Sequence, residues 1–361
     1  MLSKALVIGA YQKKAEELAK LPDLDLTVVV PPGWREGRIF IPLERSHLQG
    51  YRLVEERLAF NGHFHFHFYP GLRRRLSECR PELVHVDEEP YNLATLQALL
   101  LARRAGARTL FFSWQNLYRR YPFPFRLVER ACYALADAAI AGSEGACEVL
   151  RRKGFAKPIA IIPQFGVDPD LFSPQPWAEQ RPFTIGYLGR LVPAKGLDTL
   201  LEAAAGLEGD FRLRLVGSGE YRSQLEEKAA RLGLTARVQF VPSVPSAEVP
   251  AQLHQLDVLV LPSLTTERWK EQFGRVLVEA MACEVAVVGS DSGEIPHVIG
   301  EAGVVFPEGK VHDLRVALQR LADDVAWRRR LAQAGRQRVL ERYTQARVAE
   351  QTYEVYQSLL S

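Results

Sequence analysis

The stretch from residue 257 to residue 296 reads DVLVLPSLTTERWKEQFGRVLVEAMACEVAVVGSDSGEIP. An apolar run, Val258 to Leu261, stops at Pro262 and predicts a buried strand. A helix is expected from about Phe273, because apolar residues then recur at helical spacing. A second apolar run, Val285 to Val288, predicts another strand. This order of strand, loop, helix and strand indicates an α/β fold with a parallel sheet, in which ligands bind at the carboxyl ends of the strands.

Two glutamates mark this stretch. Glu271 lies in the loop before the expected helix, and Glu279 lies eight residues later, inside it. Between them, Phe273 and Gly274 place a glycine at the helix start, where free N–H groups and the helix dipole suit a phosphate. The alternatives are an acidic residue favoured near a helix N-terminus, and an ion pair of Glu279 with Arg275 on a solvated face. The apolar neighbours of Glu279 argue against a solvated face, because a buried carboxylate needs a partner.

The sequence EQFGRVLVEAMA at 271–282, followed by SDSGEIP at 290–296, resembles the two-glutamate signature of the family 4 retaining glycosyltransferases. The resemblance implies the α/β GT-B fold, in which two Rossmann-like parallel-sheet domains face a cleft. It also implies that a nucleotide-sugar donor binds mainly to the second domain. The resemblance is strong over nearly all of the second half of the chain and weak over the first half.

The length of 361 residues exceeds one typical domain, and 47% hydrophobic with 25% charged residues are ordinary globular values. We expect an amino-terminal acceptor-binding domain at 1–173, a proline-rich hinge at 174–182, and a nucleotide-sugar-binding domain at 183–344. The final helix, 345–361, is expected to pack on the first domain, as the resemblance implies. A helix packed on its own domain is the alternative.

The net charge is +3, from 24 basic minus 19 acidic residues (+5) in 1–176 and 22 minus 24 (−2) in 177–361. This modest excess without long basic runs argues against nucleic acid as the main partner. The four cysteines form no CxxC pair, which indicates free thiols in a reducing compartment. No apolar run approaches the ~20 residues of a membrane span. We expect a cytoplasmic protein, with a place at the inner face of the membrane as an alternative, and leave the oligomeric state open.

Strands at Ala5–Gly9 and Leu26–Val30 are expected to flank a helix at Lys13–Lys20 and to open the first domain as a βαβ unit. In the resembled family the first strand leads into a long glycine-rich loop, whereas only Gly-Ala-Tyr-Gln follows at 9–12. The alternating sequence HFHFHF at 63–68 predicts a sheet-edge strand with phenylalanines inward and histidines outward. A metal site formed by the three histidines is the less favoured alternative.

The stretch Leu83–Tyr91 is expected to be a strand that ends in an acidic, turn-forming segment, before a helix at Asn92–Arg104. Four residues cluster there as candidates for acceptor binding: His85, Asp87, Glu88 and Glu89. One of them would receive the proton of the acceptor. Helix capping by the acidic residues explains part of the cluster equally well.

The next strand ends at Trp114 and Gln115, where the resembled family often carries a histidine. We include both residues among the acceptor-binding candidates. The loop Trp114–Arg126 mixes aromatic and cationic side chains, which suit stacking on sugar rings or peripheral contact with lipid headgroups. Packing of these rings in the core is an equal alternative.

Gly189 and Arg190 follow the strand expected at 183–188, and Lys195 lies five residues beyond Arg190, just before a helix. Two cations in such a loop suit a diphosphate, and a solvated loop is the alternative. The resemblance supports the first interpretation, because the family holds its leaving diphosphate with a Gly-Arg…Lys-Gly element. The resemblance further implies that the backbone around Val241 and Val244 borders the base. Glu284 and Ala286 stand where the family has a small residue and a proline.

The resemblance assigns catalytic roles to Glu271, Arg190 and Lys195, and donor binding to Gly189, Phe273, Gly274, Arg275, Glu279, Val241 and Val244. It implies transfer with retention from a nucleotide-diphosphate sugar to a hydroxyl of a glycan, glycolipid or lipid-linked saccharide. No metal is expected, because the cations and the helix end balance the diphosphate charge. The pairs Asp168/Asp170 and Asp23/Asp25 have the spacing of metal-binding aspartates, and we do not favour that role. A nucleotide-sugar epimerase and a non-catalytic nucleotide-binding scaffold are the alternative functions.

Overall fold

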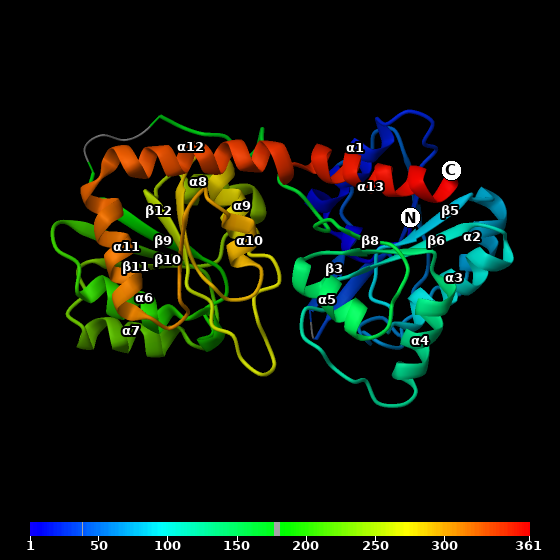
Figure 1. Ribbon diagram of the computed structural model, residues 1–361, viewed down its shortest axis with the longest axis horizontal. Coiled ribbons are helices and arrows are strands. Elements are labelled where there is room, and N and C mark those ends of the chain that lie inside the picture. The colour runs from blue at the N-terminus through cyan, green and yellow to red at the C-terminus, as the bar shows by residue number, and fades with distance from the viewer. Residues whose placement is uncertain (38, 177–180) are drawn as a thin grey trace. The chain divides into compact units, whose positions relative to one another are not determined.

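The computed structural model describes residues 1–37, 39–176 and 181–361. The chain divides into two compact units (Figure 1). Unit 1 comprises Met1–Gly166 together with Gln345–Ser361, and unit 2 comprises Val167–Thr344. Residues 177–180 of the expected hinge lie outside the described residues.

Unit 1 contains a sheet flanked by helices. Its helices are α1 (Lys13–Ala19), α2 (Leu72–Cys79), α3 (Leu93–Arg104), α4 (Phe125–Leu135), α5 (Glu144–Arg152) and α13 (Gln345–Leu360). Its parallel strands are β1 (Thr27–Val30), β4 (Arg52–Glu55), β5 (Leu83–Val86), β6 (Arg108–Ser113), β7 (Ala138–Ala141) and β8 (Ile159–Ile161). β2 (Gly33–Glu36) and β3 (Ile39–Pro42) form a separate antiparallel pair.

The strands of unit 1 pair in the order β4-β1 and β5-β6-β7-β8. The residue that joins the two groups is Leu2, which forms parallel bridges to Val29 and to Val86. The strand expected at Ala5–Gly9 is wrong, because Ala5–Val7 and Gly9–Gln12 are 3₁₀ helices, η1 and η2. Hydrogen bonds to side chains and from side chains hold this path: Gly9 N–H donates to Glu44 Oε2, and Gln12 Nε2 donates to the carbonyl oxygens of Leu6 and Glu44.

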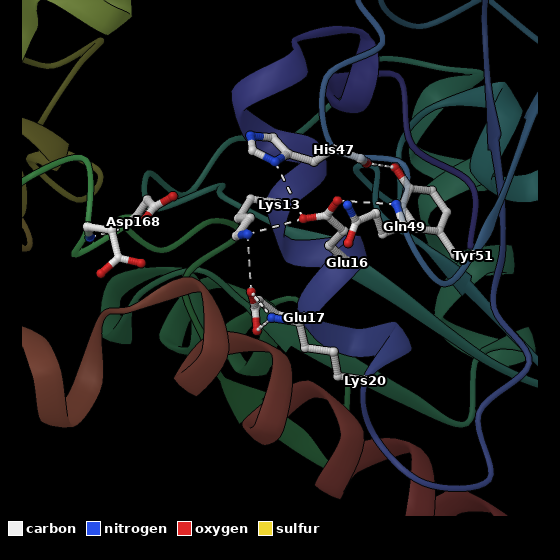
Figure 2. A network of polar contacts seen from close by, with 9 residues as sticks. Lys13, Glu16, Glu17, Lys20, His47, Gln49, Tyr51 and Asp168 are labelled. Atoms are coloured by element: carbon white, nitrogen blue, oxygen red, sulfur yellow. Dashed lines mark hydrogen bonds and ion pairs between the residues drawn. The ribbon is translucent and has the colours of Figure 1, made fainter.

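A polar network ties α1 to the segment that precedes β4 (Figure 2). Glu16 Oε1 accepts from the N–H of Gln49 at 3.2 Å, and Glu16 Oε2 lies 3.1 Å from Lys13 Nζ and 3.4 Å from His47 Nδ1. Burial alone would raise the pKa of Glu16, but these partners lower it below its ordinary value. Helix α1, which follows η2, is therefore held against the segment that precedes β4.

The last helix, α13, belongs to unit 1 and packs against α1. Its buried residues Val348, Ala349 and Tyr356 join a core cluster that includes Leu6 and Ala15. The apolar face of this helix is therefore buried within unit 1, which also contains the start of the chain.

Unit 2 is a six-stranded parallel sheet in the order β11-β10-β9-β12-β13-β14. Its strands are β9 (Phe183–Leu188), β10 (Phe211–Val216), β11 (Val238–Val241), β12 (Val258–Leu261), β13 (Ala286–Ser290) and β14 (Val304–Phe306). Its helices are η3 (Pro193–Lys195), α6 (Leu197–Ala205), α7 (Arg222–Arg231), η4 (Ser246–Glu248), α8 (Val249–Leu253), α9 (Arg275–Ala282), α10 (Ile295–Ile299), α11 (Val311–Asp323) and α12 (Val325–Arg342). The long α12 packs along α9 and β13 (Figure 1).

The strand order of unit 2 reverses between β9 and β12. The chain proceeds from β9 to β10 and β11 on one side, then crosses back to β12, β13 and β14 on the other. Strands β9 and β12 are buried almost throughout, as expected for a parallel sheet covered on both faces. At such a switch point the loops after the two central strands diverge and leave room for a ligand.

Candidate functional site

The loops after β9 and β12 carry most of the donor-site candidates of unit 2. The loop after β9 contains Gly189, Arg190 and Lys195, and the loop after β12 leads to Glu271 and Gly274. The two strands are paired through Val258 with Ile185 and through Leu259 with Gly186, so their carboxyl ends lie at the same edge. The fold therefore gathers these residues at the switch point.

Lys195 and Glu271 are in direct contact. Lys195 Nζ lies 2.6 Å from Glu271 Oε2, and the same oxygen accepts a hydrogen bond of 2.8 Å from Ser263 Oγ. Lys195 Nζ also lies 4.7 Å from the ring centroid of Trp269, at cation–π distance. Glu271 is only 8% exposed. A cation and a carboxylate are thus held together in a place largely shielded from water.

Two glycines allow the loops to approach closely. Gly196 has φ +67°, and a Cβ there would lie 1.9 Å from the carbonyl oxygen of Pro262. Gly293 has φ +59°, and a Cβ there would lie 2.0 Å from the carbonyl oxygen of Glu271. Both contacts exclude a side chain. The glycines of the sequence motifs therefore set the distance between Lys195 and Glu271.

Arg190 lies on the exposed side of the same loop. Its carbonyl oxygen accepts a hydrogen bond of 2.7 Å from Tyr187 Oη, which fixes the backbone while the side chain is exposed. Val241, at the end of β11, and Val244 are partly buried against the core of unit 2. These two valines lie two strands away from β9, on the β11 side of the sheet.

Helix α9 begins directly after Gly274, which has φ +79°. Phe273 packs edge-on against Tyr343 at a centroid distance of 5.7 Å. Inside the helix, Arg275 Nε donates to Glu279 Oε1 at 2.8 Å. The Glu279 side chain is 12% exposed. It therefore fits the expected apolar setting with a partner better than it fits a solvated face. Burial raises the pKa of Glu279, and Arg275 opposes this effect.

In unit 1, Glu88 is the centre of a buried charged group. Glu88 Oε2 lies 2.7 Å from Lys4 Nζ and 2.6 Å from His67 Nε2, and Tyr69 Oη donates to Glu88 Oε1 at 3.4 Å. Burial alone would raise the pKa of Glu88, but Lys4 and His67 hold it well below its ordinary value. Glu88 therefore stays ionised and has its negative charge compensated.

The two neighbouring carboxylates have weaker compensation. Ser3 Oγ donates to Asp87 Oδ2 at 2.7 Å, and burial raises the pKa of Asp87. Glu89 accepts from Ser113 Oγ at 2.7 Å and from the N–H of Trp114 at 2.8 Å. Burial raises the pKa of Glu89 to about 7 against these hydrogen bonds. A carboxylate that titrates near neutral pH is suited to exchanging a proton.

His85 lies apart from this group. Its Nδ1 is 2.7 Å from Tyr356 Oη on α13, and burial lowers the pKa of the imidazole well below its ordinary value. Trp114 Nε1 donates to Gln164 Oε1 at 2.8 Å, and its ring covers Gly142. Gln115 Oε1 accepts from Lys153 Nζ at 2.8 Å. The structure thus brings Glu89 and Trp114 together through the backbone, whereas His85 faces the last helix.

The strand expected at 63–68 is wrong, because this segment consists of turns with a single bridge from Phe68 to Ala59. The alternation fails because His67 is drawn into the core by Glu88, and the ring of His65 lies 4.5 Å from that of Phe125. Within the described residues, no group of three or more His, Cys, Asp or Glu side chains has the arrangement of a metal site.

In the loop Trp114–Arg126, some aromatic rings pack against neighbouring residues and others are exposed, so each of the two expectations describes part of the loop. The rings of Tyr121 and Tyr91 pack in a tilted arrangement with centroids 4.4 Å apart, and Lys153 Nζ lies 4.7 Å from the centroid of the Tyr121 ring. By contrast, Phe123 is 80% exposed and Tyr118 is 41% exposed. No helix in the described parts of the chain has the length and apolarity needed to cross a bilayer.

Sequence reasoning missed several residues that support the candidates. Ser263 and Trp269 contact Glu271 and Lys195, and Lys4 and His67 contact Glu88. Ser263 had a signal, because it follows Pro262 directly at the end of a buried strand, where ligand-facing residues gather. Lys4 and Glu88 are 84 residues apart, and their pairing has no local signal.

The chain matches two families of known proteins. Residues 170–338 match the family described as "Glycosyl transferases group 1", and residues 15–171 match "Glycosyltransferase Family 4". The chain belongs to the group 1 glycosyltransferases. The expected family and the expected GT-B fold are thereby confirmed.

Individual proteins extend the comparison. An MMP alpha-(1->4)-mannosyltransferase from Mycolicibacterium hassiacum is 31% identical over 255 residues, which cover 69% of this chain and 60% of that relative. A glycosyltransferase from Rickettsia africae has a similar structure, with a TM-score of 0.76, 16% identity, and coverage of 100% of this chain and 97% of that one. Anabaena Alr3699/HepE, solved with UDP, has a TM-score of 0.72, 17% identity, and coverage of 99% and 98%. The chain spans less than two thirds of the length of that mannosyltransferase.

Proposed function

We propose that the protein transfers a sugar, with retention of anomeric configuration, from a nucleotide-diphosphate sugar to a hydroxyl of a saccharide, glycolipid or lipid-linked acceptor. The observation that carries this proposal is the contact of Lys195 with Glu271 at the switch point of unit 2. A cation for the diphosphate and a carboxylate for the sugar hydroxyls are adjacent there, as the directly joined diphosphate and sugar of a nucleotide sugar require. That Anabaena Alr3699/HepE was solved with UDP supports a nucleotide donor.

In this proposal the donor replaces the ion pair. Its diphosphate takes Lys195 and Arg190 as partners, together with the N–H groups at the start of α9 near Phe273 and Gly274. Glu271 is then released from Lys195, keeps its hydrogen bond from Ser263, and accepts hydrogen bonds from the sugar hydroxyls. Glu279 accepts hydrogen bonds from the ribose hydroxyls, and the backbone between Val241 and Val244 borders the base.

The reaction follows from this placement of charge. The acceptor oxygen forms a bond to the anomeric carbon while the bond from that carbon to the phosphate oxygen breaks. The electron pair goes to the phosphate oxygen, which takes the proton of the acceptor hydroxyl. Lys195, Arg190 and the helix N-terminus stabilise the negative charge that grows on the diphosphate. Because these groups supply the positive charge, the proposal requires no metal ion.

We infer that unit 1 binds the acceptor through Glu89 and its neighbours. Glu89 has a pKa of about 7, so it can accept or donate hydrogen bonds to hydroxyl groups near neutral pH. Burial also raises the pKa of the neighbouring Asp87. Glu88, by contrast, stays ionised with its charge balanced by Lys4 and His67, and it serves to hold the group together.

The test is an assay of the purified protein with UDP-, GDP- and ADP-sugars, with saccharide and glycolipid acceptors, in the presence of EDTA. We expect release of one nucleoside diphosphate only when an acceptor is present, and a product whose anomeric configuration by NMR equals that of the donor. An inverted product, or activity abolished by EDTA and restored by a divalent cation, would contradict the proposal. Epimerised donor without transfer would identify an epimerase, and binding without turnover a scaffold.

A further inference from the structure

The indole ring of Trp269, in the loop after β12, lies over the ammonium group of Lys195. The distance from Lys195 Nζ to the ring centroid is 4.7 Å. The lysine side chain is only 13% exposed. A cation–π contact becomes stronger when the cation is shielded from water. The contact is therefore placed where it has a measurable effect on the lysine.

The backbone on both sides of Lys195 is fixed by the same loop. Leu264 N–H donates to the carbonyl oxygen of Ala194 at 2.8 Å. On the other side, Gly196 is so close to Pro262 that a Cβ would lie 1.9 Å from its carbonyl oxygen. The fold thus sets the place of the lysine backbone. The long side chain still has many rotamers, unless its end is held as well.

Among the described residues, a carboxylate and an aromatic ring hold the end of this side chain: Glu271 Oε2 at 2.6 Å, and Trp269. In the proposed function, on which this inference rests, a diphosphate replaces Glu271 as the ionic partner of Lys195. The indole ring does not compete with that anion, because it offers a π face and the ammonium has three N–H donors. Trp269 can therefore hold the ammonium both before and after the exchange.

Hydrogen bonds within the loop fix the backbone of Trp269. Thr266 N–H donates to the carbonyl oxygen of Trp269 at 2.7 Å, and Trp269 N–H donates to Thr266 Oγ1 at 3.0 Å. At the base of this turn, Thr265 N–H donates to Glu308 Oε2 at 2.6 Å, and Thr265 Oγ1 lies 2.9 Å from Ser292 Oγ. None of these four bonds involves the ion pair, so separating that pair leaves them in place.

We propose that Trp269 is a positioning residue for the donor diphosphate: its indole ring keeps the ammonium of Lys195 at the switch point when Glu271 is no longer paired with it. The ring acts through Lys195 and not by contact with the donor. A cation that is already in place loses less side-chain freedom when a diphosphate binds. Phenylalanine would preserve much of this effect because it also has a π face, whereas leucine has none.

An NMR experiment without nucleotide tests the positioning itself. In protein labelled with carbon-13 lysine, the indole ring should shift the signal of the Lys195 ε-methylene upfield, and Lys195→Met identifies that signal by its loss. Glu271→Gln removes the charge that pairs with the lysine, as donor binding would. We expect the upfield shift to persist in Glu271→Gln and in Trp269→Phe, and to disappear in Trp269→Leu.

Calorimetric titration with UDP, GDP and ADP tests the consequence for the diphosphate. We expect Trp269→Leu to weaken the tightest of the three by about 5- to 10-fold, and Trp269→Phe by about 2-fold. In a Lys195→Met background, Trp269→Leu should cause no further loss. Trp327→Leu is the matched control, because it removes a ring that lies 4.0 Å from the Arg320 guanidinium, between α11 and α12 of the same unit. It should leave nucleotide binding unchanged.

Loss of the upfield shift in Glu271→Gln would overturn the proposal, since the carboxylate alone would then hold the lysine. An equal weakening by Trp269→Leu with and without Lys195 would also overturn it, because the ring would act on the nucleotide or on the loop. So would a phenylalanine variant that binds as weakly as the leucine variant. If the wild type bound none of the three nucleotides, the proposed function would fail, and the NMR experiment would still decide whether Trp269 positions Lys195.

Discussion

At the scale of single residues, Glu271 contacts Lys195 and Ser263, and Lys195 in turn contacts Trp269. Lys195 balances its charge, Ser263 orients one oxygen, and Trp269 covers the lysine. Sequence alone indicated the carboxylate and the lysine, because both lie in recognisable motifs. The serine and the tryptophan were assigned only from the fold, although the position of Ser263 directly after Pro262 was a signal in the sequence.

We predict that Glu271→Ala lowers sugar transfer by at least ~100-fold while binding of the nucleoside diphosphate survives. In the proposed function the carboxylate contacts the sugar, and its removal leaves Lys195 available to the phosphates. Transfer rates and nucleotide titration by calorimetry measure the two effects separately. Glu267→Ala, at an exposed glutamate of the same loop, is the matched control. Full transfer activity in Glu271→Ala would show that the carboxylate is wrongly assigned.

Glu89 provides a prediction about pH. Its pKa rises from 4.5 to about 7 on folding, so the folded protein favours the protonated form. The resulting stability is present in full below pH 4.5 and is lost as the pH rises through 7. The difference between the two values corresponds to roughly 3 kcal/mol. Urea unfolding should therefore show a larger loss of stability from pH 5 to pH 8 in the wild type than in Glu89→Gln, with Glu82→Gln behaving as the wild type.

At the scale of elements, glycines set how closely the loops of unit 2 approach. Gly196→Ala should destabilise the protein by about 3 kcal/mol, because its Cβ would meet the carbonyl of Pro262 at 1.9 Å. It should also weaken nucleotide binding, since Lys195 is the preceding residue. Gly209→Ala is the control, because it too has positive φ (+88°) but has no atom within 4 Å of its Cβ. It should cost only about 1 kcal/mol. Equal losses in the two variants would refute the close-approach argument.

The end of α9 explains one departure from the family pattern. Glu284 has φ +55°, its N–H donates to the carbonyl of Met281, and the N–H of Val285 donates to that of Ala280. This is the Schellman arrangement, in which glycine is preferred at the position that Glu284 occupies.

We therefore predict that Glu284→Gly stabilises the protein by about 1 kcal/mol, because glycine adopts this backbone conformation without steric cost. Chemical unfolding would measure the gain, and transfer activity should not change. Glu284→Ala separates loss of the side chain from relief of backbone strain. If alanine stabilised as much as glycine, the strain would not be the cause.

At the scale of the whole molecule, the two units use the chain differently. Unit 2 is one continuous segment, Val167–Thr344, whereas unit 1 needs both ends of the chain. Three buried residues of α13, Val348, Ala349 and Tyr356, complete a core cluster that the first 166 residues leave open.

Deletion of residues 345–361 should unfold unit 1 and leave unit 2 folded. Burial of the three side chains stabilises unit 1 by roughly 5 kcal/mol, which is a large part of the stability of an ordinary domain. Calorimetry should show loss of one melting transition and retention of another that a nucleoside diphosphate still raises. Two intact transitions in the truncated chain would show that α13 is not part of the core of unit 1.

The sequence by itself determined the regular elements of unit 2 and its candidate residues. Apolar runs that end in proline or glycine specify buried parallel strands, and Glu271, Lys195 and Gly274 lie in motifs read over a few neighbouring positions. Such patterns are local, so no knowledge of distant contacts is needed. The same local reading predicted a strand at Ala5–Gly9 and another at 63–68, and both predictions were wrong.

Only the tertiary structure decided the conformation of those two segments and the pairing of Lys195 with Glu271. Gly9 is held by Glu44, His67 by Glu88, and Lys195 by Glu271, and these partners are 35, 21 and 76 residues apart. Each contact depends on which strand ends meet at an edge of the sheet, and burial then makes a polar partner obligatory. Local periodicity contains no information about that pairing, because it is set by the order of strands across the sheet and not by the order of residues along the chain.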